Sequence, residues 1–369
     1  MKIVVLSSHT PSLFWFRMDM MKSFIAAGHE VVAVGNEEEN IWQEKFLDNN
    51  IKYLKANISR TSVNPLNDVK TLLSLKQILK QEKPDKIFAY QAKTVVYGSI
   101  AARLLKIKEV YSLIAGVGSV FLSSGVKAKL VRRILITEYK VALKGNSKVF
   151  FQNNDDVELF VSNKIVEREK IVMLNGSGVN LDKFEASPMP PEFAFLCISR
   201  LIRDKGVVEY LEAAKLVKSK YPEIKFMLVG PYDSNPSALK PEDLKPHIDD
   251  QTIEYFGEQS DVKPYLQKCW VYVLPSYREG TPKTVLEAMA TKRAVITTDA
   301  PGCRETVTDG VNGYLVPIKD VDALAKRMVD LIETPETAKK MAEAGRKLAE
   351  TKFDVNIVNK SINQTMKLI

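Results

Sequence analysis

The feature that most constrains the fold is an alternation of short apolar runs with helical stretches, in two blocks. The runs of the first block are KIVVLS, EVVAVG, IKYL, DKIFAY, EVYSLI and KVFFQN. Those of the second block are FAFLCIS, KFMLVG, IEYFG, VYVLP, AVITT and GYLVP. Continuous apolar runs with helices between them indicate parallel strands that helices cover on both faces. We therefore predict an α/β protein with two Rossmann-like, doubly wound parallel-sheet domains.

A segment rich in Gly, Ser and Pro separates the two blocks. It covers residues 175–192 and has no hydrophobic period, which is typical of a linker. A chain of 369 residues is long enough for two cores. The predicted domains are 1–185 and 186–353, with a terminal helix at 354–369 that is a candidate to pack back on the first domain.

The composition, 45% hydrophobic and 27% charged, is typical of a soluble globular protein. No apolar run approaches the ~18 residues of a membrane span, and the start MKIVVLSSHT lacks a signal-peptide layout. The three scattered cysteines form no disulfide framework and no metal-binding spacing. We expect a cytoplasmic protein without a metal site and without a nucleic-acid partner.

The net charge of +8 belongs entirely to the first half of the chain. Residues 1–185 hold 27 Lys and Arg against 19 Asp and Glu, whereas the remainder holds 26 of each kind. The segment 124–148 alone has seven basic residues and one acid, Glu138. This segment is either an ordinary helix with a solvated basic side or a helix that lies on an anionic membrane. Its candidate membrane-facing residues are Lys127, Lys129, Arg132 and Arg133.

The strongest candidate for a ligand site is the stretch REGTPKTVLEA, residues 278–288, which follows the predicted strand VYVLP. Thr281 suits the N-cap of a helix and Pro282 suits its first position. The amides of Lys283 and Thr284 would then be free donors at the positive end of the helix. Such a helix start is an anion site that could hold a diphosphate.

Two glutamates flank this helix start. Glu287 stands about one 5.4 Å turn beyond Thr284 on nearly the same face, where its carboxylate could accept hydrogen bonds from both ribose hydroxyls. Glu279 lies on the other side of the anion site and would face the group that the diphosphate carries. The alternative is that Glu279 is a loop charge and Glu287 a solvated helix residue.

A second loop, SRLIRDKG at 199–206, follows the strand FAFLCIS and supplies cations. Arg200, Arg203 and Lys205 could neutralise a departing diphosphate, since Arg binds it in a bidentate manner and Lys acts as a point charge. No Asp-x-Asp stands at a strand end to hold a divalent ion instead. The alternative is that these are solvated surface charges.

These motifs resemble those of retaining glycosyltransferase family 4. EGTPKTVLEA is similar to its E-x7-E signature and SRLIRDKG to its diphosphate loop, while PGCRETVTDGVNGYLV and NGSGVNLDKF are similar to its neighbouring elements. The resemblance covers about residues 170–320 strongly. It implies a GT-B fold whose two domains face a central cleft, no cofactor or catalytic metal, and a nucleotide-sugar donor bound mainly by the second domain.

Carried over by position, the resemblance implies roles for individual residues. The implied catalytic residues are Glu279, Arg200 and Lys205. The implied donor-binding residues are Arg200, Lys205, Tyr255, Phe256, Gly257, Glu279, Gly280, Thr281, Lys283, Thr284 and Glu287.

The first loop of the chain, SSHTPSLFWFR, departs from the Gly-Gly pair of many family members. His9, Phe16 and Arg17 instead resemble the Ser-His…Phe-Arg loop of a subgroup that adds N-acetylhexosamines to polyprenyl-diphosphate-linked sugars. The run GVGSVF resembles a dinucleotide fingerprint, but no acidic strand end follows it at ~20 residues. The candidate acceptor-side residues are His9, Arg17, Gly116 and Gly118.

The sequence thus predicts a retaining, metal-independent hexosyltransferase on the inner face of the cell membrane. It would transfer a sugar, an N-acetylhexosamine from a UDP donor, to a polyprenyl-diphosphate-linked saccharide in capsule or other surface-glycan synthesis. One alternative is a nucleotide-sugar epimerase of similar fold, although its acid and base groups are scarce in the first-domain loops. Another is a non-catalytic partner that binds a nucleotide sugar.

Overall fold

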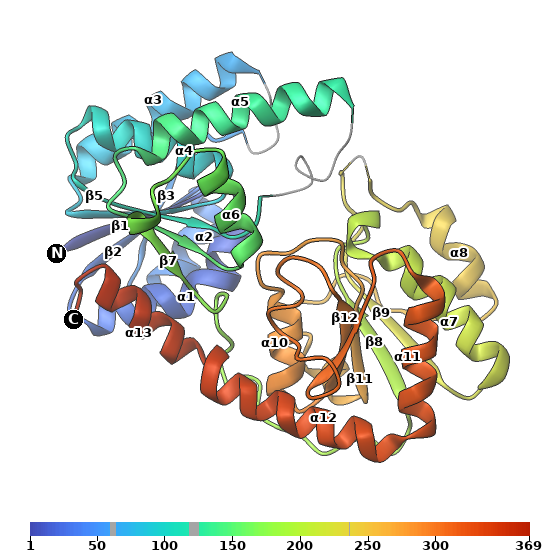
Figure 1. Cartoon of the computed structure of the whole chain (residues 1–369). Coiled ribbons are helices and arrows are strands. Elements are labelled where there is room, and N and C mark those ends of the chain that lie inside the picture. The colour runs from blue at the N-terminus through green and yellow to red at the C-terminus, as the bar shows by residue number, and fades with distance from the viewer. Residues whose placement is uncertain (60–63, 118–124, 236) are drawn as a thin grey trace. The chain divides into compact units, whose positions relative to one another are not determined.

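The computed structural model describes residues 1–59, 64–117, 125–235 and 237–369 (Figure 1). The chain forms two compact units, one of Met1–Ser177 with Val355–Ile369 and the other of Gly178–Asp354. Among the described residues no helix is long and apolar enough to cross a membrane.

The first unit contains a seven-stranded sheet with the order β3-β2-β1-β4-β5-β6-β7. Its strands are β1 (Lys2–Ser7), β2 (Glu30–Gly35), β3 (Lys52–Lys55), β4 (Lys86–Tyr90), β5 (Glu109–Ile114), β6 (Lys148–Phe151) and β7 (Ile171–Met173). All pairings are parallel. The order reverses between β1 and β4, and in doubly wound sheets ligands bind beyond the carboxyl ends of the strands at such a switch point.

Helices cover both faces of this sheet. They are α1 (Thr10–Ala26), α2 (Glu39–Leu47), α3 (Pro65–Glu82), α4 (Ala92–Leu104), α5 (Val126–Leu143), α6 (Asn154–Ser162) and α13 (Val355–Thr365). The core on one face takes residues from α3, α4, α5 and α6, and the core on the other takes them from α1, α2 and α13. Asn64 accepts a hydrogen bond from the Leu66 amide and so caps α3, whose first residue is a proline.

The second unit repeats the same strand order, β10-β9-β8-β11-β12-β13. Its strands are β8 (Ala194–Ile198), β9 (Lys225–Val229), β10 (Glu254–Tyr255), β11 (Val271–Leu274), β12 (Ala294–Thr298) and β13 (Gly313–Val316). Its helices are α7 (Val207–Lys220), α8 (Pro241–Asp249), α9 (Lys263–Gln267), α10 (Lys283–Ala290), α11 (Val321–Glu333) and α12 (Pro335–Leu348). All strand pairings are again parallel, and the switch point lies between β8 and β11.

Along the chain, the boundary between the units falls between Ser177 and Gly178, eight residues before the predicted boundary at 185. Most of the predicted linker 175–192 therefore packs on the second unit. The buried Arg293 explains this packing, because its guanidinium donates to the carbonyl oxygens of Ser187 (3.0 Å) and Pro188 (3.0 Å). The terminal segment 355–369 belongs to the first unit, where α13 packs on α1.

Candidate active site

The loops after β8 and β11 meet at the switch point of the second sheet. The carbonyl oxygen of Asp204 accepts hydrogen bonds from the Tyr277 amide (2.9 Å) and the Ser276 hydroxyl (3.1 Å). Gly206 has a φ of 71°, and a Cβ there would lie 2.0 Å from the carbonyl oxygen of Pro275. Only glycine allows this approach without strain. Gly206, the last residue of SRLIRDKG, therefore lets this loop pack against Pro275, the residue that follows β11.

This contact brings Lys205 and Glu279 together. Their side chains form an ion pair, although 74 residues separate them, and they are 20% and 13% exposed. The Glu279 amide donates to the carbonyl oxygen of Pro301 (2.8 Å), and a Cβ at Gly302 would lie 2.3 Å from the carbonyl oxygen of Glu279. The loop after β12 therefore fixes the backbone of Glu279 from the other side.

Helix α10 begins one residue later than predicted. Pro282 occupies the N-cap with an extended backbone and Lys283 is the first helical residue, so the assignment of Thr281 as N-cap is wrong. The ring of Pro282 fixes φ near −65°, and its ψ of 110° keeps it out of the helix. The Thr284 hydroxyl, at the second helical position, accepts a hydrogen bond from the buried Tyr272 (2.6 Å).

Glu287 is buried, with 7% of its surface exposed, and is not the solvated helix residue of the alternative interpretation. Burial raises the pKa of its carboxyl to about 7, while the charges of Lys283 and Lys183 oppose the increase and Asp261 adds to it. The carboxyl thus stands one helical turn beyond Thr284 and changes charge near neutral pH. A buried carboxylate gains by accepting hydrogen bonds from a ligand.

Arg200 lies in the same loop but contacts a different partner. Its Nη1 donates to Asp233 (2.7 Å), in the segment after β9, and its side chain remains 43% exposed. Arg203, also exposed, approaches Asp243 at 3.9 Å. The loop therefore presents one cation next to Glu279 and two nearer the β9 side.

The predicted base-binding residues lie at the end of β10, at the edge of the sheet. The Tyr255 hydroxyl donates to the Gly230 carbonyl (2.8 Å), and the Gly230 amide donates to the Gly257 carbonyl (2.8 Å). The rings of Phe256 and Tyr265 are 4.9 Å apart. Gly257 has open space where a Cβ would be, so its backbone is accessible to a flat ligand.

In the first unit, Gln91 organises the corresponding switch point. It follows β4 directly, and its Oε1 accepts hydrogen bonds from the Ser8 amide (3.0 Å) and hydroxyl (2.8 Å) and from the Ser7 hydroxyl (3.1 Å). Its φ of 71° is rare for a residue with a side chain and is typical of functional sites. His9, half-buried, follows these serines as the N-cap residue of α1 without a side-chain cap bond.

Arg17 lies inside the first unit. It is 4% exposed, its Nη1 donates to Ser177 (2.7 Å) and its guanidinium lies 4.8 Å from the centre of the Tyr90 ring. Burial lowers the pKa of Arg17. Gly116, with a φ of 105°, is in the loop after β5, whereas Gly118 lies outside the described residues.

Sequence reasoning missed Gln91 and Asp233, and it gave no role to the loop 299–302 after β12, although the segment from Pro301 onward carries part of the resemblance. Gln91 and the loop could have been found, since both follow strands that the sequence predicts and carboxyl ends of parallel strands share one edge. Asp233 lies farther from its strand and has no such signal. Among the described residues no three His, Cys, Asp or Glu side chains are grouped so that they could hold a metal ion.

Two family models match the chain, one for each unit. Residues 2–153 match "Glycosyl transferase 4-like" and residues 181–348 match "Glycosyl transferases group 1".

Curated relatives match along most of the chain. The N,N'-diacetylbacillosaminyl-diphospho-undecaprenol α-1,3-N-acetylgalactosaminyltransferase of Campylobacter jejuni is 31% identical over 97% of this chain and 96% of its own length. A UDP-Gal:α-D-GlcNAc-diphosphoundecaprenol α-1,3-galactosyltransferase of Escherichia coli is 26% identical over 77% of this chain and 76% of its own.

A solved structure has the same fold. The Anabaena protein HepE in complex with UDP-glucose aligns over 100% of both chains with a TM-score of 0.80 and 18% identity. The two parallel-sheet units are thus those of the GT-B fold. Both family models match, and a 31% identical relative aligns over nearly the whole chain. This protein therefore belongs to the glycosyltransferases whose first domain is of the "Glycosyl transferase 4-like" family and whose second domain is of the "Glycosyl transferases group 1" family.

Proposed function

We propose that this glycosyltransferase transfers an N-acetylhexosamine from a UDP donor to a polyprenyl-diphosphate-linked saccharide in surface-glycan synthesis. The observation that carries the proposal is the ion pair of Lys205 and Glu279 at the switch point of the second sheet. The substrates follow from the relatives in Campylobacter jejuni and Escherichia coli, whose names specify diphospho-undecaprenol-linked acceptors.

The donor site would work by exchanging ionic partners. Without donor, Lys205 neutralises Glu279; with donor, its ammonium would lie against the diphosphate, and Glu279 would accept a hydrogen bond from a hydroxyl of the sugar. As the bond from sugar to diphosphate breaks, negative charge grows on the diphosphate and positive charge on the sugar ring. Lys205 stabilises the first and Glu279 the second, so both contacts strengthen in the transition state.

We propose that transfer occurs with retention and without a metal ion. Arg200 and Lys205 supply the positive charge that a leaving diphosphate requires, and Arg can bind two phosphate oxygens at once. The amides at the start of α10 add the positive end of a helix. No cofactor is required, because the donor itself carries the activated sugar.

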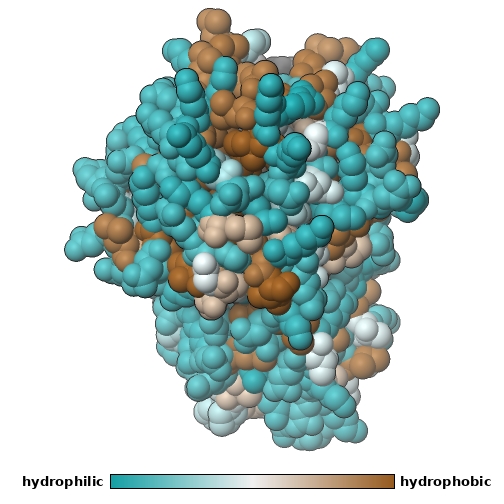
Figure 2. All heavy atoms as spheres, turned by 90° about the vertical axis from the view of Figure 1, so that its left-hand side faces the viewer, coloured by the Kyte–Doolittle hydropathy of each residue, from teal (hydrophilic) through white to brown (hydrophobic). Residues whose placement is uncertain are grey.

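Membrane association would place the acceptor within reach. The first halves of α3 and α5 expose large apolar side chains between basic ones, and we name them the amphipathic surface. Its members are Leu66, Val69, Lys70, Leu73, Val126, Lys129, Leu130, Arg133 and Ile134. Brown side chains stand among teal ones at the top of Figure 2, where Figure 1 places α3 and α5. Such a surface fits the interface of an anionic bilayer, here the inner face of the cell membrane.

Among the predicted membrane-facing residues, Lys129 and Arg133 are exposed and Arg132 is half-buried. The side chain of Lys127 lies outside the description. Val126 and Leu130, which are 86% and 60% exposed, are the apolar members that the charge pattern did not reveal.

The test is a donor screen against a defined acceptor. UDP-linked N-acetylgalactosamine, N-acetylglucosamine, galactose and glucose would each be incubated with undecaprenyl-diphosphate-linked N-acetylglucosamine; mass spectrometry would identify the products, and NMR would give the anomeric configuration of the new linkage. We expect one N-acetylhexosamine to be added in an α linkage. Transfer of galactose or glucose alone would refute the proposed donor, and a β-linked product would refute retention.

A further inference from the structure

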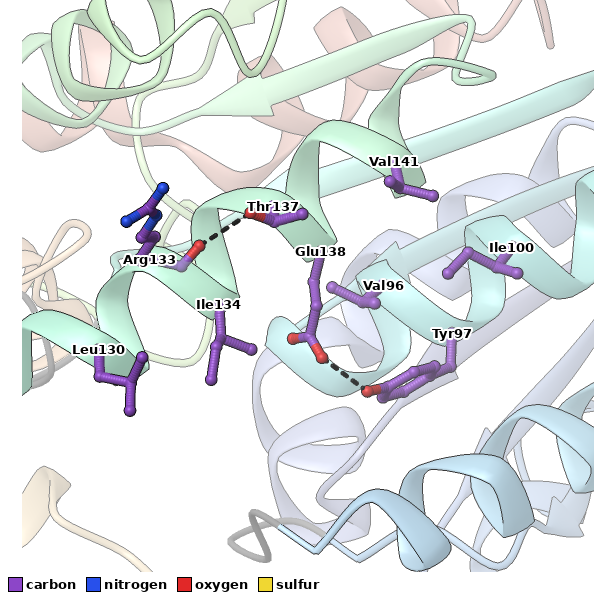
Figure 3. A pocket seen from close by; sticks show the side chains of 9 residues that line it. All are labelled: Val96, Tyr97, Ile100, Leu130, Arg133, Ile134, Thr137, Glu138 and Val141. Carbon is purple, nitrogen blue, oxygen red and sulfur yellow. Dashed lines mark hydrogen bonds between the residues drawn. The ribbon is translucent and has the colours of Figure 1, made fainter. Parts of the chain in front are cut away.

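A groove lies between α4 and α5, and none of the residues that line it belongs to the donor site. It encloses about 440 Å³ and lies on the outer side of the helix layer that covers one face of the first sheet. The residues that line it are Val96, Tyr97 and Ile100 from α4 and Leu130, Arg133, Ile134, Thr137, Glu138 and Val141 from α5 (Figure 3).

The lining is apolar except for Tyr97, Thr137, Glu138 and Arg133. The Tyr97 hydroxyl donates to Glu138 (3.0 Å), and the Thr137 hydroxyl donates to the Arg133 carbonyl in its own helix (3.0 Å). Leu130 and Ile134 point to the same side of α5, whereas the guanidinium of Arg133 points away from this row (Figure 3). A ligand would therefore meet mostly hydrocarbon inside the groove, together with the paired side chains of Tyr97 and Glu138, and a cation at its rim.

The dimensions fit a single flexible chain. From Leu130 to Val141 the lining runs ~17 Å along α5. An apolar chain about 5 Å wide, judged from the ~4 Å contact of carbon atoms, fills roughly 330 Å³ over that length. A helix at least 10 Å wide would need roughly 1,300 Å³. The volume of about 440 Å³ thus accommodates the chain and excludes a whole helix.

The position of the groove connects it to the acceptor-side loop. Helix α4 starts directly after Gln91, which holds Ser7 and Ser8 at the end of β1. Val96 is five residues farther along, or ~7.5 Å. One end of the groove therefore lies about two helical turns or less from the candidate acceptor site, and Leu130 at this end belongs to the amphipathic surface.

We propose that the groove holds the isoprenoid chain of the lipid-linked acceptor, with its diphosphate near Arg133 and Lys129 and its sugar toward the loop after β1. An apolar groove with a cationic rim complements a molecule with an apolar tail and an anionic head. This inference rests on the proposed function for the identity of the carrier. It adds that the enzyme binds the chain itself, in addition to the surface of the bilayer.

The test uses a geranyl diphosphate that carries a benzophenone, photo-crosslinked to the whole chain in detergent and mapped by mass spectrometry. We expect labels in the peptides that contain residues 96–100 and 130–141, and protection by farnesyl diphosphate. Because the probe needs neither a donor nor turnover, failure of the proposed sugar transfer leaves this result unaffected. Labels elsewhere, or equal protection by straight-chain dodecyl phosphate, overturn the proposal.

Two substitutions fill the groove without introducing charge, Thr137→Trp and Val141→Trp, both at exposed positions. The indole ring would displace part of the probe's hydrocarbon chain from the groove. Each CH₂ or methyl group of the probe that is no longer buried weakens binding about fourfold, so each substitution should lower specific labelling roughly tenfold. Leu47→Trp is the matched control, since Leu47 is 53% exposed on α2, which packs on the opposite face of the sheet. Thermal unfolding followed by circular dichroism checks that the first unit of each variant is folded. Undiminished labelling in both folded groove variants contradicts the proposal.

Discussion

Replacing the buried Glu287 by Gln should stabilise the protein at alkaline pH and weaken its binding of UDP. The pKa of this carboxyl is about 7 in the folded chain against an ordinary value of 4.5, so the folded state binds the proton more tightly. Stability of this origin is fully present below pH 4.5 and is lost as the pH rises through 7. The difference corresponds to about 3 kcal/mol. Glu287→Gln stays neutral at every pH and avoids this loss.

Urea unfolding at pH 4.5, 6 and 8 measures the effect. The variant should match the natural protein at pH 4.5 and exceed it by about 3 kcal/mol at pH 8. Glu223→Gln, at an exposed position in the same unit, should show no such divergence. Equal or lower stability of Glu287→Gln at pH 8 would refute the reasoning from burial.

The same group predicts how UDP binding depends on pH. If the ionised carboxylate accepts hydrogen bonds from the ribose, the affinity of the natural protein for UDP should fall as the pH decreases from 8 to 6. The affinity of Glu287→Gln should be lower at pH 8 and should change less over this range than that of the natural protein, because only the terminal phosphate of UDP, with a pKa of about 6, still titrates there. Calorimetry at both pH values measures this, and a natural protein with pH-independent affinity would contradict the assignment of Glu287 to the ribose.

Other substitutions separate the remaining roles. Lys205→Ala should lower kcat by roughly 10²–10³, the loss typical of one preorganised donor to a developing anion, and activity should survive a chelator; a loss of activity that magnesium restores would contradict metal independence. Glu279→Gln should lower kcat strongly with nearly unchanged UDP affinity, and normal turnover would refute its contact with the sugar. Gly302→Ala should destabilise the fold and lower kcat, because its Cβ meets the Glu279 carbonyl; unchanged stability and kcat would contradict the close packing. Arg133→Glu should weaken binding to anionic vesicles but not UDP affinity, and binding should weaken with salt, since the Debye length is ~10 Å at 0.1 M; equal binding to neutral vesicles would refute the electrostatic part.

The sequence by itself determined the class of structure and the local motifs that form the candidate site of the second unit. Every predicted strand run overlaps a strand of the two sheets, although the sequence does not predict β7 (Ile171–Met173), and α5 lies within the basic segment 124–148 for which a helix is expected. These features depend on local patterns, because apolar runs, proline positions and helical periods act within a few residues. The spacing of Glu279 and Glu287 across a helix start is equally local, and so could be read from eleven consecutive residues.

Only the tertiary structure decided which of these parts meet. The contact of Lys205 with Glu279, the partner of Arg200 and the burial of Glu287 depend on the order of the strands, which local periodicity does not encode. The same is true of residues 178–192, which carry a linker's composition but are held by Arg293, more than a hundred residues away. The groove between α4 and α5 exists only because these two helices pack side by side. Partners this distant are brought together by burial summed over the whole sheet, and that sum exists only once the chain has folded.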